Sequence, residues 1–138
     1  MMSATGQCLC GAVTYIAKDV HYALHSCHCK MCQRWYGGPA FAAPVGSITF
    51  NGEEFIRRYN SSDWAERGFC KNCGTGLFFR MKETDRYFVG MGTFDDLALF
   101  KLSGEIYIEH KPSAYDFVGD HPRMTGEEFT AFMQKLGN

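Results

Sequence analysis

The stretch Cys70-Lys71-Asn72-Cys73-Gly74 joins two cysteines across a tight turn, and a second pair, Cys8-Leu9-Cys10, lies near the start of the chain. Gly74 allows the left-handed backbone that such turns often need. If Cys8 and Cys10 are extended, residues i and i+2 face the same side, so both sulfurs can point to one place. Four thiolates complete a tetrahedral zinc site. We therefore predict a structural zinc on Cys8, Cys10, Cys70 and Cys73.

Such a site would join the start of the chain to its middle, across about 60 residues. A link over so long a loop restricts the unfolded chain strongly. Binding of a structural zinc is also coupled directly to folding. We expect this site to hold the fold together.

The other three cysteines stand within six residues, in Cys27-His28-Cys29-Lys30-Met31-Cys32. Catalytic zinc sites use three protein ligands and keep a fourth position for water or substrate. We therefore predict a second, catalytic zinc on Cys27, Cys29 and Cys32. The alternatives are a closed site with a histidine as fourth ligand, or an iron or iron–sulfur site; the candidate histidines are His25, His28 and His110. The ring of His28 should point away from the metal, because both of its neighbours are proposed ligands.

Zinc(II) with three thiolates carries a net charge of −1, so its remaining Lewis acidity is modest. It should acidify water less than a three-histidine site does, and it suits a soft, anionic fourth ligand. A further thiolate meets that description and stays electron-rich enough to attack a carbon electrophile. The chemistry points to a small thiol as the partner of this site.

The composition excludes several other classes of protein. A chain of 138 residues with a formal charge of −1 and interspersed signs does not predict a nucleic-acid surface. Met1 to Gly6 lack the basic start and apolar run of a signal peptide, and the uncharged stretch from Trp35 to Gly52 is broken by prolines and glycines, so no membrane helix is expected. An odd number of cysteines argues against a disulfide framework, although unligated buried cysteines remain an alternative. We expect a single domain over residues 1–138, located in the cytoplasm.

The middle of the chain predicts short strands, rich in β-branched and aromatic residues and separated by Gly, Asn and Asp. This spacing favours a mainly β domain built from small sheets. The predicted strands are Ala12–Ala17, Ser47–Phe50, Phe55–Tyr59, Gly76–Met81, Tyr87–Met91 and Glu105–Glu109.

A helix is predicted at the C-terminal end. Thr125 and Glu128 form a capping box, and Gly137 is a stop signal. Between them, apolar residues repeat at i, i+3, i+4 and i+7, which predicts a stripe packed on the core: Phe129, Phe132, Met133 and Leu136. A short helical turn from Lys30 to Trp35 is a weaker prediction.

Three segments resemble the glutathione-dependent formaldehyde-activating enzyme family, which also includes centromere-protein-V-like proteins. They are Gly6-Gln7-Cys8-Leu9-Cys10-Gly11-Ala12-Val13, Cys27-His28-Cys29-Lys30-Met31-Cys32-Gln33-Arg34 and Arg67-Gly68-Phe69-Cys70-Lys71-Asn72-Cys73-Gly74-Thr75. The resemblance covers roughly residues 5 to 118, and the ordered set of seven cysteines is its most specific part.

The resemblance implies a β-tent fold with one structural and one catalytic zinc on the two cysteine groups named above. It also implies a carbon–sulfur lyase that combines glutathione and formaldehyde into S-hydroxymethylglutathione. In that scheme the glutathione sulfur binds the open zinc and attacks the aldehyde carbon.

Residues just after the triplet are the candidates for binding the thiol. Glutathione has two carboxylates, which arginine recognises well. Arg34 is the first candidate, Lys30 the second, and Trp35 can form an apolar wall; a solvated surface for the two cations and core packing for Trp35 are the alternatives. A different class of function also stays open, in which the chain is a non-catalytic zinc module that binds a partner through an apolar loop, Pro39 to Val45. A third option is a metal-carrier or redox-sensing role for the triplet.

Overall fold

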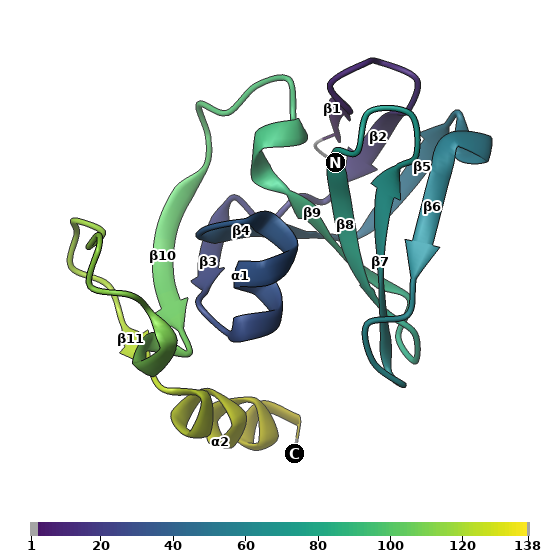
Figure 1. Ribbon diagram of the computed structural model, residues 1–138. Helices are drawn as coiled ribbons and strands as arrows, with labels where there is room; N and C mark the ends of the chain where they lie inside the picture. The colour runs from purple at the N-terminus through teal and green to yellow at the C-terminus, as the bar shows by residue number, and fades with distance from the viewer. Residues whose placement is uncertain (1–2, 138) are drawn as a thin grey trace. The chain divides into compact units, whose positions relative to one another are not determined.

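The computed structural model describes residues 3–137 (Figure 1). Backbone contacts group these residues into two compact units, and each is described by itself. The first comprises residues 3–22 and 42–100, and the second comprises residues 23–41 and 101–137. The prediction that Met1 to Gly6 is not a signal peptide includes residues 1 and 2, which lie outside the described residues.

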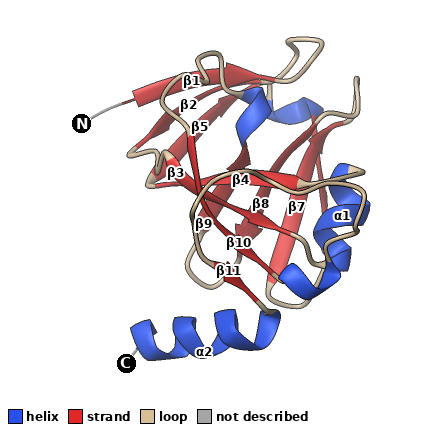
Figure 2. Ribbon diagram, turned by 90° about the vertical axis from the view of Figure 1, so that its left-hand side faces the viewer, coloured by secondary structure: helices blue, strands red, loops and turns tan. Residues whose placement is uncertain are grey.

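The first unit contains a three-stranded antiparallel sheet, β1-β2-β5, whose strands lie side by side in Figures 1 and 2. The strands are β1 (Ser3–Gln7), β2 (Thr14–Lys18) and β5 (Ser47–Asn51). Gln7 pairs with Thr14, so the segment between them, which carries Cys8 and Cys10, forms the connection of a hairpin.

The same unit contains a run of antiparallel strands in the order β4-β9-β8-β7-β6. Their bounds are β4 (Ala40–Val45, of which residues 42–45 belong to this unit), β6 (Ile56–Tyr59), β7 (Ala65–Cys70), β8 (Gly76–Met81) and β9 (Arg86–Gly90). Two 3-10 turns, η1 (Glu53–Phe55) and η2 (Met91–Thr93), precede β6 and follow β9.

The core of this unit has two clusters, and Phe50 and Tyr87 pack against both. One is purely structural: Tyr15, Ala17, Ala43, Val45, Val89 and Phe94. The other contains two of the predicted zinc ligands, Cys8 and Cys70, together with Val13, Leu77 and Phe78. The predicted zinc site therefore borders the hydrophobic core.

The second unit is built on three parallel strands, β11-β10-β3. They are β3 (Ala23–Cys27), β10 (Lys101–Ile106) and β11 (Arg123–Met124). The helices are α1 (Lys30–Tyr36), the 3-10 turn η3 (Ile108–His110) and α2 (Gly126–Gly137), which follows β11 (Figure 2). The short helical turn predicted after Cys29 is thus confirmed as α1, and Gly37, with φ +74°, ends it.

The fold class is confirmed as mainly β with a short C-terminal helix. The prediction for Gly76–Met81 matches β8, and those for β2, β5, β6 and β9 are displaced by one or two residues at most at each end. The prediction for Glu105–Glu109 is wrong for its second half, because the strand spans Lys101–Ile106 and a 3-10 turn follows. The sequence prediction did not include β1, β3, β4, β7 or β11.

The C-terminal helix begins as predicted, but its apolar stripe does not pack as predicted. The backbone N–H of Thr125 donates to Glu128 Oε1 at 2.8 Å, and the Glu128 N–H donates to Thr125 Oγ1 at 3.1 Å, which confirms the capping box. Phe129 is half-buried near the ring of Tyr107. Phe132, Met133 and Leu136 are 44%, 49% and 65% exposed, so the expected core packing is wrong for most of the stripe. Periodicity defines an apolar face, but it does not supply a surface to cover that face.

Candidate metal centres

The four paired cysteines converge in the first unit. The sulfurs of Cys8, Cys10, Cys70 and Cys73 all lie within 4.8 Å of one another. The Sγ–Sγ distances are 3.7 Å for Cys8 and Cys10 and 3.8 Å for Cys10 and Cys70. Cys8 and Cys70 are buried, whereas Cys10 is exposed. The donor set fits a closed, tetrahedral zinc site.

The local reason expected for the first pair is wrong. Cys8 and Cys10 do not lie in an extended strand, because the N–H of Gly11 donates to the carbonyl of Cys8 at 3.2 Å and closes a turn after β1. Leu9 at the tip of this turn is 85% exposed. The two sulfurs therefore meet because the backbone reverses, in the same way as at the second pair.

The second pair has the expected turn. Cys70 ends β7, and its carbonyl accepts a hydrogen bond from the N–H of Gly74 at 2.7 Å. Gly74 has φ +83°, the left-handed conformation that glycine adopts without steric cost. The glycine therefore serves the turn, as predicted.

Two polar side chains that the sequence analysis did not single out join the pairs. Thr75 Oγ1 accepts the N–H of Leu9 at 3.0 Å and lies 3.1 Å from Cys73 Sγ. Asn72 Nδ2 donates to Cys10 Sγ at 3.2 Å. Thr75 thus bonds to the backbone of the turn that carries Cys8 and Cys10, and Asn72 bonds to a sulfur of that turn. These two hydrogen bonds join the turns without a metal. The position of Asn72 and Thr75 within or beside Cys70-Lys71-Asn72-Cys73 is the signal by which they could have been found.

These contacts also set the ionisation of the thiols. Hydrogen bonding to Thr75 lowers the pKa of Cys73 to about 5. The backbone N–H of Ala12 and the side chain of Asn72 lower the pKa of Cys10, while burial raises the pKa of Cys70 to about 11. Two of the four sulfurs are thus stabilised as thiolates, the form that binds metal.

The triplet converges in the second unit. Cys27 ends β3, Cys29 immediately precedes α1, and Cys32 lies in the first turn of α1. Their three sulfurs lie within 4.8 Å of one another, and all three residues are half-buried. Among the described residues, no imidazole or carboxylate joins this group.

Each histidine that was considered as a fourth ligand is engaged elsewhere. The ring of His28 is fully buried and bonds to Glu105, as its predicted direction away from the sulfurs requires. The ring of His25 lies over Gly104, where an added Cβ would be 2.4 Å from His25 Cδ2. His110 Nε2 lies 4.0 Å from Glu109 Oε2. The geometry therefore favours the open three-cysteine arrangement over a closed one.

The sulfurs of the triplet also interact with one another. The N–H of Cys32 donates to Cys29 Sγ at 3.4 Å, so Cys29 caps α1. Hydrogen bonds from the Cys27 and Cys32 side chains lower the pKa of Cys29, whereas side-chain hydrogen bonds with Cys29 and Cys32 raise the pKa of Cys27. The hydrogen bonds to Cys29 Sγ favour its thiolate, the form that binds metal.

Gln33 and Glu105 both bond to His28, which lies within the triplet, and no pattern in the sequence predicts a role for either. Gln33 Nε2 donates to the carbonyls of His28, at 2.6 Å, and of His110, at 2.8 Å. Glu105, in β10, is fully buried and accepts from His28, His121 and Arg123. The bonds from Gln33 to His110 and from His28 to Glu105 each join residues 77 positions apart, so no local sequence pattern could have predicted them.

Aromatic rings adjoin the buried histidine. Phe117 stacks on His28 with ring centroids 5.8 Å apart and an interplanar angle of 27°. Phe41 and Tyr115 pack against Phe117 at 5.2 and 5.3 Å. This unit therefore holds His28 between polar partners and an apolar wall.

The residues predicted to bind the thiol all lie on α1. Lys30 and Arg34 are exposed, and at i and i+4 they share one face of the helix. Trp35 is half-buried. Their role in ligand binding stays a prediction.

The segment Pro39 to Val45 is not the apolar loop expected for a binding module. Residues 40–45 form β4, in which Ala40, Ala43 and Val45 are buried. The other residues of β4 are half-buried, so the segment is a strand rather than an exposed loop. This observation removes the feature on which the non-catalytic alternative rested.

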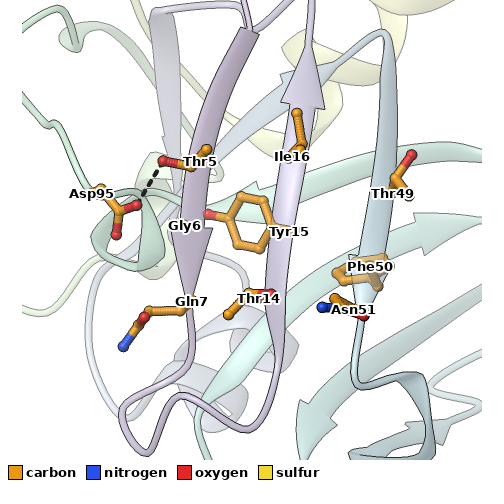
Figure 3. A pocket seen from close by; sticks show the side chains of 10 residues that line it. All are labelled: Thr5, Gly6, Gln7, Thr14, Tyr15, Ile16, Thr49, Phe50, Asn51 and Asp95. Atoms are coloured by element: carbon orange, nitrogen blue, oxygen red, sulfur yellow. Dashed lines mark hydrogen bonds between the residues drawn. The ribbon is translucent and has the colours of Figure 1, made fainter.

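A hollow of about 500 Å³ lies on the three-stranded sheet of the first unit (Figure 3). Its lining comes from β1, β2, β5 and Asp95, and it includes no cysteine. Thr5 Oγ1 donates to Asp95 Oδ2 at 2.6 Å at one side. The exposed lining is mostly apolar, and Asp95 is its one charged side chain, so it does not provide the groups that the predicted chemistry needs.

Comparison with known proteins identifies the family. Residues 3–110 match the family model described as glutathione-dependent formaldehyde-activating enzyme. The chain belongs to this family. A Schizosaccharomyces pombe protein described as an uncharacterized lyase is 34% identical over 127 residues, which is 89% of this chain and 91% of the relative. The fold is similar to a crystal structure of a Rhodobacter sphaeroides protein, with a TM-score of 0.56 and 20% identity over 86% of this chain and 98% of the other.

These findings support a lyase of this family with two cysteine groups that could hold zinc. In the described part of the chain, the helices are all too short or too polar to cross a bilayer.

Proposed function

We propose that the protein is a zinc-dependent carbon–sulfur lyase that combines a small thiol, with glutathione as first candidate, with formaldehyde or a related aldehyde. The observation that carries this proposal is the convergence of three cysteine sulfurs with no histidine or carboxylate among them in the described residues. Membership in the formaldehyde-activating family supports the choice of substrates.

The two cysteine groups would have different tasks. Cys8, Cys10, Cys70 and Cys73 would hold a structural zinc, and Cys27, Cys29 and Cys32 would hold a catalytic zinc. When bound by the triplet, zinc supplies a fourth coordination position that favours a soft anionic ligand such as a thiolate.

The reaction itself is an addition. The thiol sulfur forms a bond with the aldehyde carbon, the carbon–oxygen π bond breaks, and the proton of the thiol ends on the oxygen. The product is an S-hydroxyalkyl thioether, and no oxidant or reductant is consumed.

The chain's own residues would bind and orient the thiol. Arg34 and Lys30 lie four residues apart on the exposed side of α1, so their cations can pair with the two carboxylates of glutathione. Trp35, half-buried on the same helix, would supply an apolar contact. These roles rest on the position of α1, which begins at the triplet.

Native mass spectrometry of the purified chain, with and without glutathione, tests the proposal. We expect two zinc ions per chain and a specific glutathione adduct, followed by adduct formation with formaldehyde. A Cys32→Ser variant should retain one zinc and lose the adduct. Two zinc ions with no thiol adduct, or a single zinc in the unaltered chain, would contradict the proposal and favour a non-catalytic zinc module.

A further inference from the structure

We propose that Glu105 is a positioning residue for the three-cysteine group. It holds the ring of His28 inside the protein, and His28 in turn keeps Cys27 and Cys29 on one side of the chain. This inference rests on the proposed function of the triplet as a metal site.

The carboxylate of Glu105 is fully buried and fully engaged. Its Oε1 accepts from His28 Nε2 at 2.8 Å, and its Oε2 accepts from His121 Nε2 at 2.6 Å and Arg123 Nε at 3.0 Å. Only 1% of Glu105 is exposed. A buried carboxylate is costly unless donors satisfy it, and a fully satisfied network is rigid.

The donors act on the ionisation of this group as expected. Burial alone would raise the pKa of Glu105, but hydrogen bonds from His121 and His28, with the charge of Arg123, outweigh burial and lower it. An ionised carboxylate only accepts hydrogen bonds. Both imidazoles must therefore present an Nε2–H to it, which fixes the orientation of the His28 ring.

Both the backbone and the ring of His28 are held by hydrogen bonds. Its backbone N–H donates to the carbonyl of Ile106 at 3.0 Å, its own carbonyl accepts from Gln33 Nε2 at 2.6 Å, and its ring bonds to Glu105. The first two contacts fix the backbone, and the third fixes the direction of the side chain. The ring also lies 3.5 Å from Tyr115 Oη through Nδ1 and stacks on Phe117, but its bond to Glu105 is the shorter of its two hydrogen bonds and the charge-assisted one. We therefore assign the direction of the His28 ring mainly to Glu105.

The side to which the His28 side chain points decides the side to which the side chains of Cys27 and Cys29 point. Cys27 ends a strand, and Cys29 is extended, with φ −61° and ψ 154°. In an extended segment, residues i and i+2 face the side opposite to residue i+1. With His28 turned inward and 0% exposed, Cys27 and Cys29 must share the other side, where they are half-buried and meet Cys32.

The network also fixes the segment of residues 117–123, which leads into β11. Arg123 Nη2 donates to the carbonyls of Phe117, at 2.9 Å, and of Gly119, at 3.0 Å. The same Arg123 binds Glu105, so the carboxylate joins residues 117–123 to the cysteine loop. Phe117, which stacks on His28, is thereby held against the ring that Glu105 orients.

The test is Glu105→Gln in the full chain. Glutamine keeps the shape but places an amide against the two imidazoles and removes the charge that Arg123 binds. We expect the affinity for the second zinc to fall about 10- to 100-fold, as for other residues that orient metal ligands, with the first zinc unchanged. Chelator competition followed by native mass spectrometry measures the two affinities separately, and the absorption of the cobalt-loaded chain reports the sulfur geometry.

Glu66→Gln is the matched control. Glu66 is also a buried carboxylate and accepts from Arg58 at 3.2 Å and Arg80 at 2.6 Å, but it belongs to the first unit. It should lower stability while leaving the second zinc affinity unchanged. An equal loss of second-zinc affinity in both variants would overturn the inference, because it would reflect general destabilisation.

A double-mutant cycle separates positioning through His28 from an independent effect. His28→Phe keeps bulk but removes the bond to Glu105, so its effect on the second zinc and that of Glu105→Gln should be strongly non-additive. Additive effects would overturn the route through His28.

Arg123→Leu removes one donor at the more exposed end of the network and should give a smaller loss of second-zinc affinity. If Glu105→Gln does not fold, Arg123→Leu still tests the inference. Unchanged second-zinc affinity in Arg123→Leu would then contradict a positioning role of the Glu105 network.

The outcomes distinguish this inference from the proposed function. If the unaltered chain binds no second metal, both fail. If it binds two zinc ions and a thiol, and Glu105→Gln does the same with equal affinity, only the role of Glu105 fails.

Discussion

The two cysteine groups reach similar sulfur spacing by different means. In the first unit, two tight turns each bring a pair of sulfurs together, and Asn72 and Thr75 join the turns through hydrogen bonds to the sulfurs and the backbone. In the second unit, one short segment from the end of β3 into the first turn of α1 carries all three sulfurs, and Glu105 bonds to His28 within that segment as part of a buried ionic network. Cys8 and Cys70 of the first group belong to a core cluster and Cys73 packs against it, whereas Cys10 is exposed. The difference agrees with the proposed roles: the group proposed to hold the fold has two of its four sulfurs in the core, whereas the group proposed to react is half-buried.

The largest effect is expected for Cys70→Ala. Its sulfur is 0% exposed in a core cluster, and structural zinc supplies about 10–16 kcal/mol of binding free energy that is coupled to folding. We expect the variant to lose cooperative folding, measured as loss of the thermal transition and of the first zinc. A soluble variant with unchanged melting would remove the distinction between the two groups.

Cys32→Ser should affect chemistry far more than folding. It removes one of three sulfurs from a half-buried loop, so we expect loss of the second zinc and a fall in kcat/KM of at least about 100-fold, the scale of a lost orienting or ligating group. The melting temperature should stay within a few degrees of the unaltered chain. Complete unfolding would mean that the triplet is also structural.

Arg34→Ala sharpens the comparison, because only the three-cysteine group is proposed to bind a substrate. We expect KM for glutathione to rise about tenfold with kcat little changed, as for loss of one charge-assisted contact to a carboxylate. Steady-state kinetics with glutathione and with a thiol lacking carboxylates provides the measurement and its control. An equal change for both thiols would exclude carboxylate recognition by Arg34.

The smallest effect is expected for Thr75→Val in the first group. The variant loses the bond to Leu9 and the contact with Cys73, which should lower the free energy of unfolding by about 1–2 kcal/mol. Denaturant titration of the zinc-loaded chain measures this change, and Thr49→Val on the exposed face of β5 is the control. No difference between the two variants would show that the turns need only the metal to stay together.

Much of the fold and of both sulfur groups could be predicted from local sequence. Strands such as β8 and β5 carry their own β-branched and aromatic residues, and the capping box of α2 lies within four residues. β3 and β7 were missed because their residues are small, polar or charged, and only pairing with neighbours makes them strands. The stripe of α2 was assigned to the core, yet whether an apolar face is covered depends on what lies opposite, and most of this one is exposed.

The sequence by itself determined which sulfurs can act together, because chelation by Cys27, Cys29 and Cys32 or by Cys70 and Cys73 depends on spacings of a few residues. Only the tertiary structure decided what supports them. His28 meets Glu105 across 77 residues of sequence, and Cys10 meets Cys70 across 60. The physical reason is that hydrogen bonds and metal–ligand bonds act over only about 2–3 Å in space, while a local sequence pattern does not specify which distant strand packs alongside.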